Sequence, residues 1–279
     1  MRRRRLGATL RRLRNGANLS LDEAAARMGW KAPKMSKIEN ATLGIRAPDV
    51  KRLLDVYEVE DETVLPALEN LARDAGKRGW WQTYSGVMSQ SYADYIALES
   101  DASRIRQWSG LIPGLLQTGA YAREVITATN DAGITADEVN GLVEVRQARQ
   151  AVLTRPGAPL ELWAVINQAA LHQRFAMRPE TMRDQLRRLR EVAELPGITI
   201  QVMPLACTPH PGLAGPFSVV SFPGPMLDVV LLENFLGNSY LEDEKAGPAF
   251  GSAFERIVAA ALAPDDSLAL IHRLEDESS

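Results

Sequence analysis

The stretch that most constrains the fold of this 279-residue chain is SLDEAAARMGWKAPKMSKIEN, residues 20 to 40. Ser20, followed three positions later by a glutamate, forms a capping box that satisfies backbone N–H groups at the start of a helix. Apolar residues at helical spacing follow, and Gly29 supplies the positive φ that ends this helix. A second helix begins near Ala32, because Pro33 is tolerated only in a first turn. The stretch therefore predicts a helix-turn-helix.

The second helix has the composition of a DNA-recognition helix. Its apolar residues fall on the inward side, whereas Lys34, Ser36 and Lys37 fall on the outward side. Lysine can donate to guanine O6 and N7 or to phosphate, serine can contact either, and Ala32 can contact a thymine methyl group. We expect these four residues to read bases in the major groove. The alternative is an ordinary helical hairpin with a solvated charged face.

Basic residues on both sides of this stretch predict contacts with DNA phosphates. The candidates are Arg11, Arg12, Arg46, Lys51 and Arg52. Ahead of the first helix, residues 2 to 5 form an arm of four consecutive arginines. Such an arm can lie along phosphates or enter an A·T-rich minor groove. The sequence equally allows a disordered, solubilising terminus.

Charge is divided unevenly along the chain. Up to Tyr57 there are fourteen Lys or Arg and five Asp or Glu, a net charge of +9. The remainder has eighteen basic and thirty acidic residues, a net charge of −12, and the two parts make up the overall −3. This separation predicts a basic part that faces a polyanion and an acidic part that does not bind nucleic acid.

Residues 6 to 57 resemble the lambda-repressor-like helix-turn-helix domain of the XRE family, with LRRLRNGANLSLDEAAARMGWKAPKMSKIEN carrying its landmarks in order. The resemblance implies that Glu39 braces the helices rather than contacting DNA. The family's usual glycine after this segment is replaced by Ala41, and Gly44 could supply the turn instead. Domains of this type usually bind as homodimers to palindromic double-stranded DNA, with half-sites about one turn, ~34 Å, apart.

The fold class predicted is a mainly α helix-turn-helix domain of five helices, residues 1–76, followed by a mixed α+β domain with a small sheet, residues 77–279. The fifth helix is expected from Thr63 to about Ala75, and the polar segment GKRG, 76–79, marks the boundary. Helices are also expected at 91–106, 136–153, 168–195 with a break near Pro179, 248–262 and 266–274. Short apolar runs predict strands at 160–166, 198–205, 217–222 and 228–234.

Residues 77 to 274 resemble the C-terminal domain, of unknown function, of a family of XRE regulators from actinobacteria. The motifs that carry this resemblance are WWQTY, LIPGLLQTGAYA, VRQARQAVL, ITIQVMP, GPFSVVSFP and DVVLLEN. The resemblance implies a developmental or antibiotic-related regulator, commonly encoded beside a small partner protein that this domain binds or senses. Gln168 stands where the family commonly has a glutamate.

Polar and aromatic side chains in this second part could form a ligand or partner cleft. The candidates, expected to pack together from helices and a strand, are Arg106, Trp108, Arg146, Arg149 and Trp163. The alternative, which we favour for most of them, is that the tryptophans belong to the core and the arginines pair with the many acidic residues.

Catalysis, metals and cofactors have little support. Cys207, the single cysteine, excludes an intrachain disulfide and suits a reducing compartment. With His210 it could supply a nucleophile and a base, but no thiol-hydrolase signature surrounds it. The three histidines have no metal-ligand spacing, and no glycine-rich phosphate loop follows a strand. With neither a signal peptide nor a membrane-spanning run, the expectation is a cytoplasmic non-enzyme without cofactor.

The function predicted is sequence-specific DNA binding for transcriptional regulation, with the acidic domain sensing a protein partner or ligand. One alternative is an antitoxin-like or anti-regulator module that captures a small basic partner and binds DNA mainly to regulate its own synthesis. Another is a small-molecule-sensing repressor.

Overall fold

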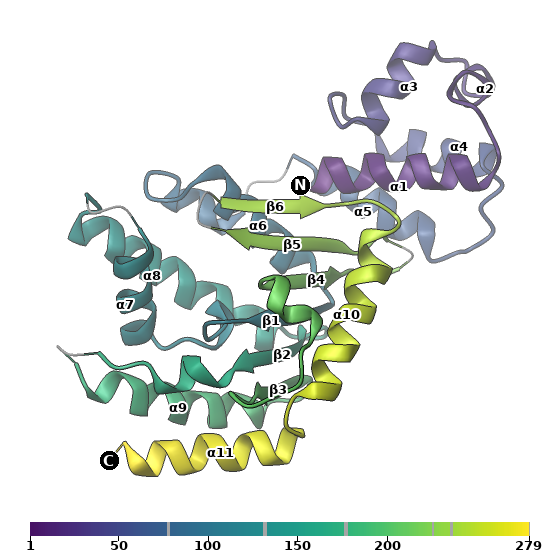
Figure 1. Ribbon diagram of the computed structural model, residues 1–279. Helices are drawn as coiled ribbons and strands as arrows, with labels where there is room; N and C mark the ends of the chain where they lie inside the picture. Colours follow the sequence, from purple (N-terminus) through teal and green to yellow (C-terminus); the bar gives the residue numbers. More distant parts are fainter. Residues whose placement is uncertain (77–78, 131–132, 176–177, 225, 235–236, 279) are drawn as a thin grey trace.

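The N-terminal region is a bundle of five helices, as predicted (Figure 1). A computed structural model describes residues 1–279 except 77–78, 131–132, 176–177, 225, 235–236 and 279. The helices are α1 (Arg2–Gly16), α2 (Leu21–Arg27), α3 (Ala32–Glu39), α4 (Ala47–Val56) and α5 (Val64–Asp74). Their inward stripes, including Leu10, Leu53 and Leu68, are fully buried in one core. Residues 77 and 78 of the expected domain boundary lie outside the described residues.

The expectation for the N-terminal arginines is wrong. The four arginines at residues 2 to 5 are not an arm ahead of the first helix, because α1 already begins at Arg2. Their side chains contact residues far along the chain, and Arg5 is only 5% exposed. The physical reason is that carboxylates of the C-terminal region, which lie far away in the sequence, pair with Arg2, Arg4 and Arg5.

The C-terminal region is built on a six-stranded mixed sheet with the order β3-β2-β1-β4-β5-β6. The strands are β1 (Arg104–Ser109), β2 (Glu161–Asn167), β3 (Ile198–Met203), β4 (Phe217–Ser221), β5 (Val229–Asn234) and β6 (Gly237–Leu241). β1, β2 and β3 are parallel, whereas β4, β5 and β6 continue from β1 as an antiparallel ladder. The predicted fold class and four predicted strands are confirmed.

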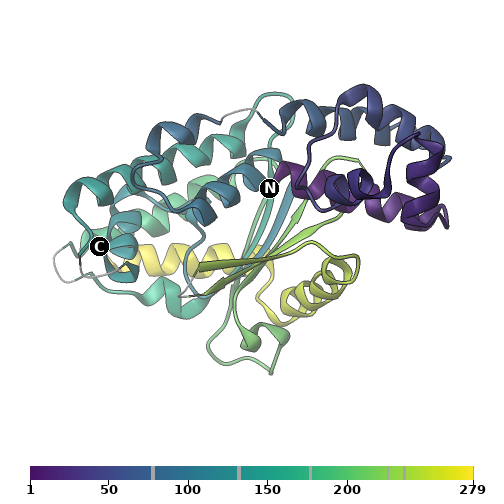
Figure 2. The ribbon, with the colours of Figure 1, turned by 90° about the horizontal axis from the view of Figure 1, so that it is seen from above.

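Helices cover both faces of this sheet (Figure 2). One face carries α6 (Gln90–Asp101), α7 (Gly119–Thr129), α8 (Ala136–Arg149), α9 (Glu180–Ala193) and α11 (Pro264–Glu277), and the other carries α10 (Ala246–Ala260). Short 3₁₀ helices connect them at Trp80–Tyr84, Gly114–Leu116, Gln150–Thr154, Gln168–His172 and Pro211–Ala214. Because β1 is central, its side chains are buried alternately in two cores: Ile105 in the core with α9 and α11, and Trp108 in the core with α10.

Three elements differ from the sequence-based expectation. Of the helices expected at 168–195, the first is only a short 3₁₀ helix, Gln168–His172, and the α-helix begins at Glu180. The helix expected at 91–106 ends at Asp101, and Arg104 already lies in β1. The alternation of side chains in this strand was hidden because it is covered on both faces and carries arginine and glutamine among its apolar residues. β6 was not predicted, since GNSYL is short and has little apolar pattern.

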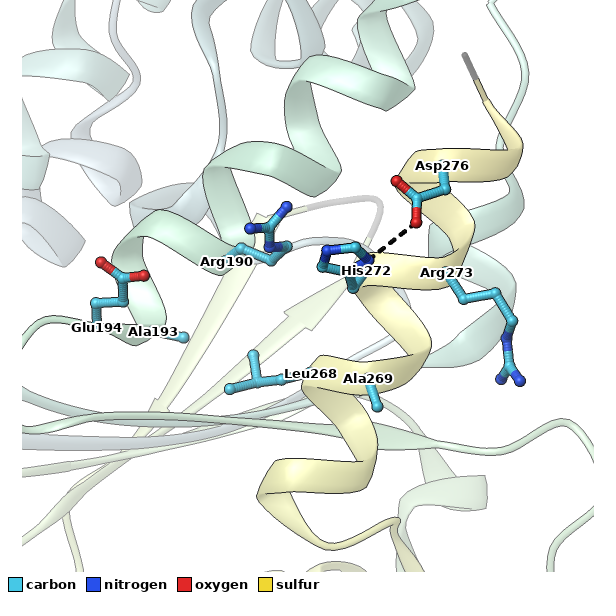
Figure 3. A pocket seen from close by; sticks show the side chains of 8 residues that line it. All are labelled: Arg190, Ala193, Glu194, Leu268, Ala269, His272, Arg273 and Asp276. Atoms are coloured by element: carbon cyan, nitrogen blue, oxygen red, sulfur yellow. Dashed lines mark ion pairs between the residues drawn. The ribbon is translucent and has the colours of Figure 1, made fainter.

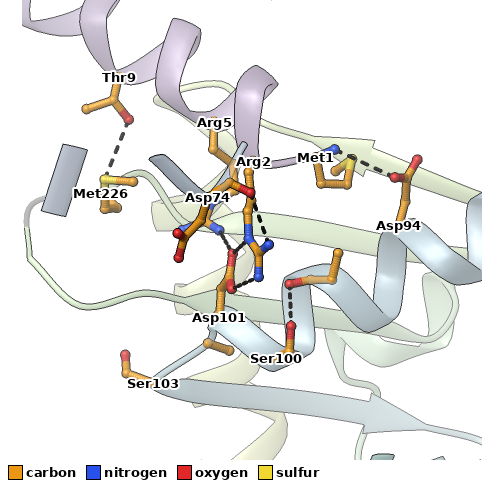
Figure 4. Close-up of polar contacts among 12 residues, drawn as sticks. Met1, Arg2, Arg5, Thr9, Asp74, Asp94, Ser100, Asp101, Ser103 and Met226 are labelled. Atoms are coloured by element: carbon orange, nitrogen blue, oxygen red, sulfur yellow. Dashed lines mark hydrogen bonds and ion pairs between the residues drawn. The ribbon is translucent and has the colours of Figure 1, made fainter. Parts of the chain in front are cut away.

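The helical bundle packs directly on the sheet region. Met226, in the connection between β4 and β5, is packed against the cores of both regions. The Thr9 hydroxyl on α1 lies 3.9 Å from the sulfur of Met226 (Figure 4). Ala67 of α5 closely approaches Gly224. The two regions therefore share an interface made by α1 and α5.

Candidate nucleic-acid interface

The α2–turn–α3 unit is formed by the local signals found in the sequence. The Ser20 hydroxyl accepts the backbone N–H of Glu23 at 3.2 Å, and the Glu23 carboxylate accepts the backbone N–H of Ser20 at 2.8 Å. Gly29 has φ +69° at the turn, and Pro33 lies in the first turn of α3. The inward residues of both helices, including Met35, are buried. This packing fixes the angle at which α3 is presented.

The outward face of α3 carries the predicted recognition residues. Lys34 and Lys37 are exposed, whereas Ala32 and Ser36 are half-buried. The ammonium group of Lys34 lies 3.7 Å from the ring centre of Trp30, an arrangement that restrains the lysine by a cation–π interaction. Sequence reasoning did not select Trp30. Its position four residues before Lys34, at the end of the turn, was the available signal.

Glu39 has the bracing contacts that the family resemblance implied. Its carboxylate is buried and accepts hydrogen bonds from Arg14 at 2.7 and 3.0 Å and from Arg11 at 3.3 Å. The hydrogen bond to Glu39 raises the pKa of Arg14 above its ordinary value. Arg14 is thus a structural residue, and Arg11, exposed for nearly half of its side chain, also donates to Asn40.

The remaining phosphate-contact candidates surround this unit. Arg46 is exposed at the N-cap of α4. Lys51 and Arg52 are exposed on α4 and form surface ion pairs with aspartates one helical turn away, at 3.2 and 3.3 Å. Such pairs contribute little free energy, so they do not prevent contact with phosphate. Arg12 is half-buried on α1.

The turn after α3 is formed differently from expectation. Ala41 itself adopts φ +61°, whereas Gly44 does not have positive φ. An L-residue other than glycine is strained in this conformation. We expect Ala41→Gly to raise the free energy of unfolding by about 0.5–1 kcal/mol, measured by urea denaturation. Gly44→Ala is the control and is expected to change stability little. An unchanged or lower stability of Ala41→Gly would contradict the strain.

The five C-terminal candidates do not form one cleft, so the expectation that they pack together is wrong. Arg106, Trp108 and Trp163 lie on the face of the sheet covered by α10, where Arg106 and Trp163 are register partners on β1 and β2. Arg146 and Arg149 lie on α8, in the helical layer on the opposite face (Figure 2). The sequence did not show that these residues lie on opposite faces of the sheet, because the start of β1 was predicted to be helical.

On the α10 face, the three candidates have structural contacts. The Trp108 indole N–H donates to the carbonyl of Gly212 at 2.9 Å, and Trp163 donates to Gln201 at 2.7 Å. Arg106 forms an ion pair with Asp228 at 3.4 Å. Burial is the main cause that lowers the pKa of this arginine. These contacts agree with the alternative for Arg106, which is paired, and for Trp108, which is 5% exposed and belongs to the core. Trp163 is 36% exposed, so for this tryptophan the expectation of a core position is wrong.

On the opposite face, Arg149 is 4% exposed and binds both oxygens of the fully buried Glu99, at 2.8 and 2.6 Å. It also donates to the Tyr92 hydroxyl at 2.8 Å and lies over the ring of Tyr95. Burial acts to lower the pKa of Arg149, but the Glu99 carboxylate outweighs it and holds that pKa well above the ordinary value. Arg146 donates to Gln117 at 2.9 Å. The Arg149 guanidinium is therefore an internal brace rather than a free ligand donor.

Cys207 and His210, the two residues considered for a thiol active site, differ in their exposure to solvent. Cys207 is exposed, whereas His210 is buried with its ring edge-on to Trp108, 5.1 Å between centroids. The His210 ring nitrogen accepts the backbone N–H of Gly212 at 3.2 Å. Within the described ranges, no three His, Cys, Asp or Glu residues form a group that could hold a metal ion. In that same part of the chain, no helix has the length and apolar character needed to cross a membrane.

A surface groove of about 560 Å³ lies between α9 and α11 (Figure 3). Its walls carry both signs of charge, from residues such as Arg190 on α9, Glu194 just after α9 and Arg273 on α11. His272 lies 3.0 Å from Asp276, one helical turn further along. None of these residues was a candidate in the sequence.

The fold and this interface define a class: a helix-turn-helix protein, which indicates DNA binding. Residues 5–68 match the family model described as a helix-turn-helix domain. Residues 92–273 match the model described as a domain of unknown function, DUF5753, and the chain belongs to that family. Searches of curated proteins and of solved structures returned no match.

Proposed function

We propose that this chain is a sequence-specific transcriptional regulator of the XRE type, in which residues 1–76 bind DNA and residues 77–279 regulate that binding. The observation that carries the proposal is the outward face of α3, with Lys34 and Lys37 exposed on a helix whose opposite side is packed in the bundle. The net charge of +9 up to residue 57 supports it, because the charge is concentrated around this unit.

In this proposal the residues have distinct roles. Lys34, Lys37, Ser36 and Ala32 contact base edges in the major groove. Phosphates are contacted by the basic residues of the surrounding helices, namely Arg11, Arg12, Arg46, Lys51 and Arg52. Because one recognition helix covers few base pairs, the chain acts as a homodimer on a palindromic operator with half-sites about 34 Å apart.

Lys34→Ala/Lys37→Ala tests the recognition helix. We expect affinity for the DNA upstream of the chain's own reading frame to fall about a hundredfold, since each good base contact contributes about 1–3 kcal/mol. Affinity for scrambled DNA of equal length is expected to fall much less. Fluorescence anisotropy at several salt concentrations measures both affinities.

The matched control is Arg256→Ala/Arg273→Ala, which removes two exposed charges from α10 and α11 and changes the net charge equally. This control is expected to leave selectivity for the upstream DNA intact. Equal, steeply salt-dependent binding to both DNAs that is unchanged by the lysine substitutions would reject base reading and leave phosphate contact alone.

The acidic C-terminal region favours a second candidate: an antitoxin-like or anti-regulator module that captures a small basic protein partner. The net charge is −12 after residue 57 and −7 within residues 77–279, and this excess of acidic residues is the observation that favours a basic partner. Co-expression with the product of the neighbouring reading frame tests it, and a complex that co-purifies in high salt would support it. A thermal shift with a metabolite fraction, and no protein complex, would favour a small-molecule-sensing repressor.

We also propose that the chain is not an enzyme. Cys207 and His210 differ in burial, one exposed and the other packed under an indole ring. Cys207→Ala is expected to leave regulation unchanged in a reporter assay. A loss of regulation with intact DNA binding would instead support a catalytic role for the Cys207 thiol.

A further inference from the structure

The first turn of α1, Arg2 to Arg5, called here the arginine turn, has a charge pattern that opposes its own helix. Four consecutive cations lie at the helix N-terminus, and the first turn contains no acidic residue. The N-terminal end of a helix carries a partial positive charge, so cations there destabilise it. Neighbouring like charges add repulsion. Local sequence alone therefore favours an unwound segment, whereas the structure has a helix.

Carboxylates of the C-terminal region compensate for this charge (Figure 4). Arg2 donates to both oxygens of Asp101, at 2.8 and 2.7 Å, and Arg5 donates to the same carboxylate at 3.2 Å. Arg4 lies 3.5 Å from Glu242, at the start of an acidic turn that also includes Asp243. The helical state of the arginine turn thus depends on residues about a hundred positions or more away.

The docked position of Arg5 is tightly packed, but it buries a cation whose hydrogen bonding is incomplete. Its guanidinium lies 3.3 Å from the ring centre of Phe222, and its Nε is buried with no hydrogen-bond partner in the described chain. Burial lowers the pKa of Arg5 to about 10, although Asp101 acts to raise it. A buried cation with incomplete hydrogen bonding stabilises a fold weakly, and such groups are best known as elements that select between states.

The arginine turn lies beside the DNA-binding unit. Gly7, one turn further along α1, touches the end of α3 so closely that an added Cβ would lie 2.5 Å from the carbonyl oxygen of Glu39. The Arg3 side chain approaches Gly44, in the loop that leads to Arg46. An unwound segment of five residues spans up to about 17 Å.

We propose that the arginine turn is a phosphate-binding segment held in reserve: docked as a helix on the carboxylates of the C-terminal region, or released to bind the DNA backbone. This inference rests on the proposed DNA-binding function and adds its regulation. Asp101 occupies, in the docked state, the place that phosphate oxygens take in the released state. A change in the C-terminal region that weakens the Asp101 contacts then strengthens DNA binding.

Asp101→Asn in the full chain tests the inference through salt dependence. Freeing Arg2 and Arg5 is expected to raise DNA affinity and to steepen the slope of log affinity against log salt by about 0.9 for each added phosphate contact, so by about 2 in total. Asp137→Asn, an exposed carboxylate at the start of α8, changes net charge equally and should change neither quantity appreciably. Adding Arg2→Gln and Arg5→Gln to Asp101→Asn should restore the wild-type slope.

The outcomes separate this inference from the proposed function. If the wild-type chain did not bind DNA, both the proposed function and the reserve segment would be rejected. DNA binding with an unchanged slope, or a lower affinity, in folded Asp101→Asn would overturn the reserve segment alone, because Asp101 would then only position the bundle.

A measurement on the wild-type chain does not depend on the stability of any variant. The backbone N–H groups of Arg4 and Arg5 donate to the carbonyl of Met1 at 2.9 and 3.1 Å in the docked state. Hydrogen exchange at these two amides should become faster when operator DNA is added, while Leu10 in the middle of α1 stays protected. Unchanged or slower exchange at Arg4 and Arg5 would overturn the proposal.

Discussion

Replacing Glu99 by alanine is expected to lower the free energy of unfolding by about 3–5 kcal/mol. The substitution leaves Arg149, which is 4% exposed, buried without its carboxylate partner. An unpaired charge in the interior causes one of the largest losses of folding free energy that a single substitution can produce. Either water must then enter beside Arg149, or α6 and α8 must unfold locally. Urea denaturation followed by tryptophan fluorescence measures the change.

Two control variants show whether the loss of stability in Glu99→Ala comes from the unpaired charge. Gln90→Ala, at the exposed start of the same helix, should alter stability by less than about 0.5 kcal/mol. Glu99→Leu combined with Arg149→Met removes both charges and should recover most of the loss, since apolar residues of similar volume can replace a buried ion pair. A single Glu99→Ala effect below about 1 kcal/mol would show that Arg149 finds another partner.

Glu39→Ala is expected to have a comparable effect on the N-terminal bundle. Glu39 is 4% exposed and binds Arg14 through two hydrogen bonds, so its removal leaves Arg14 buried beside the end of α3. We expect a loss of about 3–5 kcal/mol, and loss of DNA binding because α3 is no longer held against α1. Circular dichroism during thermal unfolding and DNA anisotropy measure the two effects.

Glu23→Ala is the matched control for Glu39→Ala. It also removes a glutamate from the helix-turn-helix, but this carboxylate is exposed and only caps α2, so a loss of about 1 kcal/mol is expected. If Glu39→Ala were no more destabilising than Glu23→Ala, the bracing contact would be energetically minor. DNA binding retained by Glu39→Ala would lead to the same conclusion.

The helix-turn-helix could be predicted because its determinants are local. The capping box at Ser20, the positive φ of Gly29 and the first-turn position of Pro33 each act within a few residues. Neighbouring sequence therefore contained all the information that decides where α2 ends and α3 begins. The predicted DNA contacts remain predictions, because which exposed side chain meets a base depends on the duplex.

The C-terminal candidates could not be placed because their environment is set by distant pairing. Arg106 lies between β2 and β4 on a strand that local pattern assigned to a helix, and only strand register shows that it faces α10. Arg149 found its partner on α6, fifty positions earlier. The arginines at 2 to 5 are a similar case, since Arg2 is paired with Asp101, ninety-nine positions away.

The central place of β1 has a consequence for the order in which the chain acquires structure. Ser103, just before β1, is bonded to Ser221 at the end of β4 across a separation of 118 positions. Closing so long a loop lowers the conformational entropy of the chain before any non-local contact can compensate for the loss. The helices of the N-terminal bundle, in contrast, are joined by short loops. During synthesis, we expect the bundle to fold on the ribosome before β1 can pair with β2 and then with β4. Ribosome-bound chains truncated after residue 150 should then resist proteolysis in the bundle but be cleaved near β1.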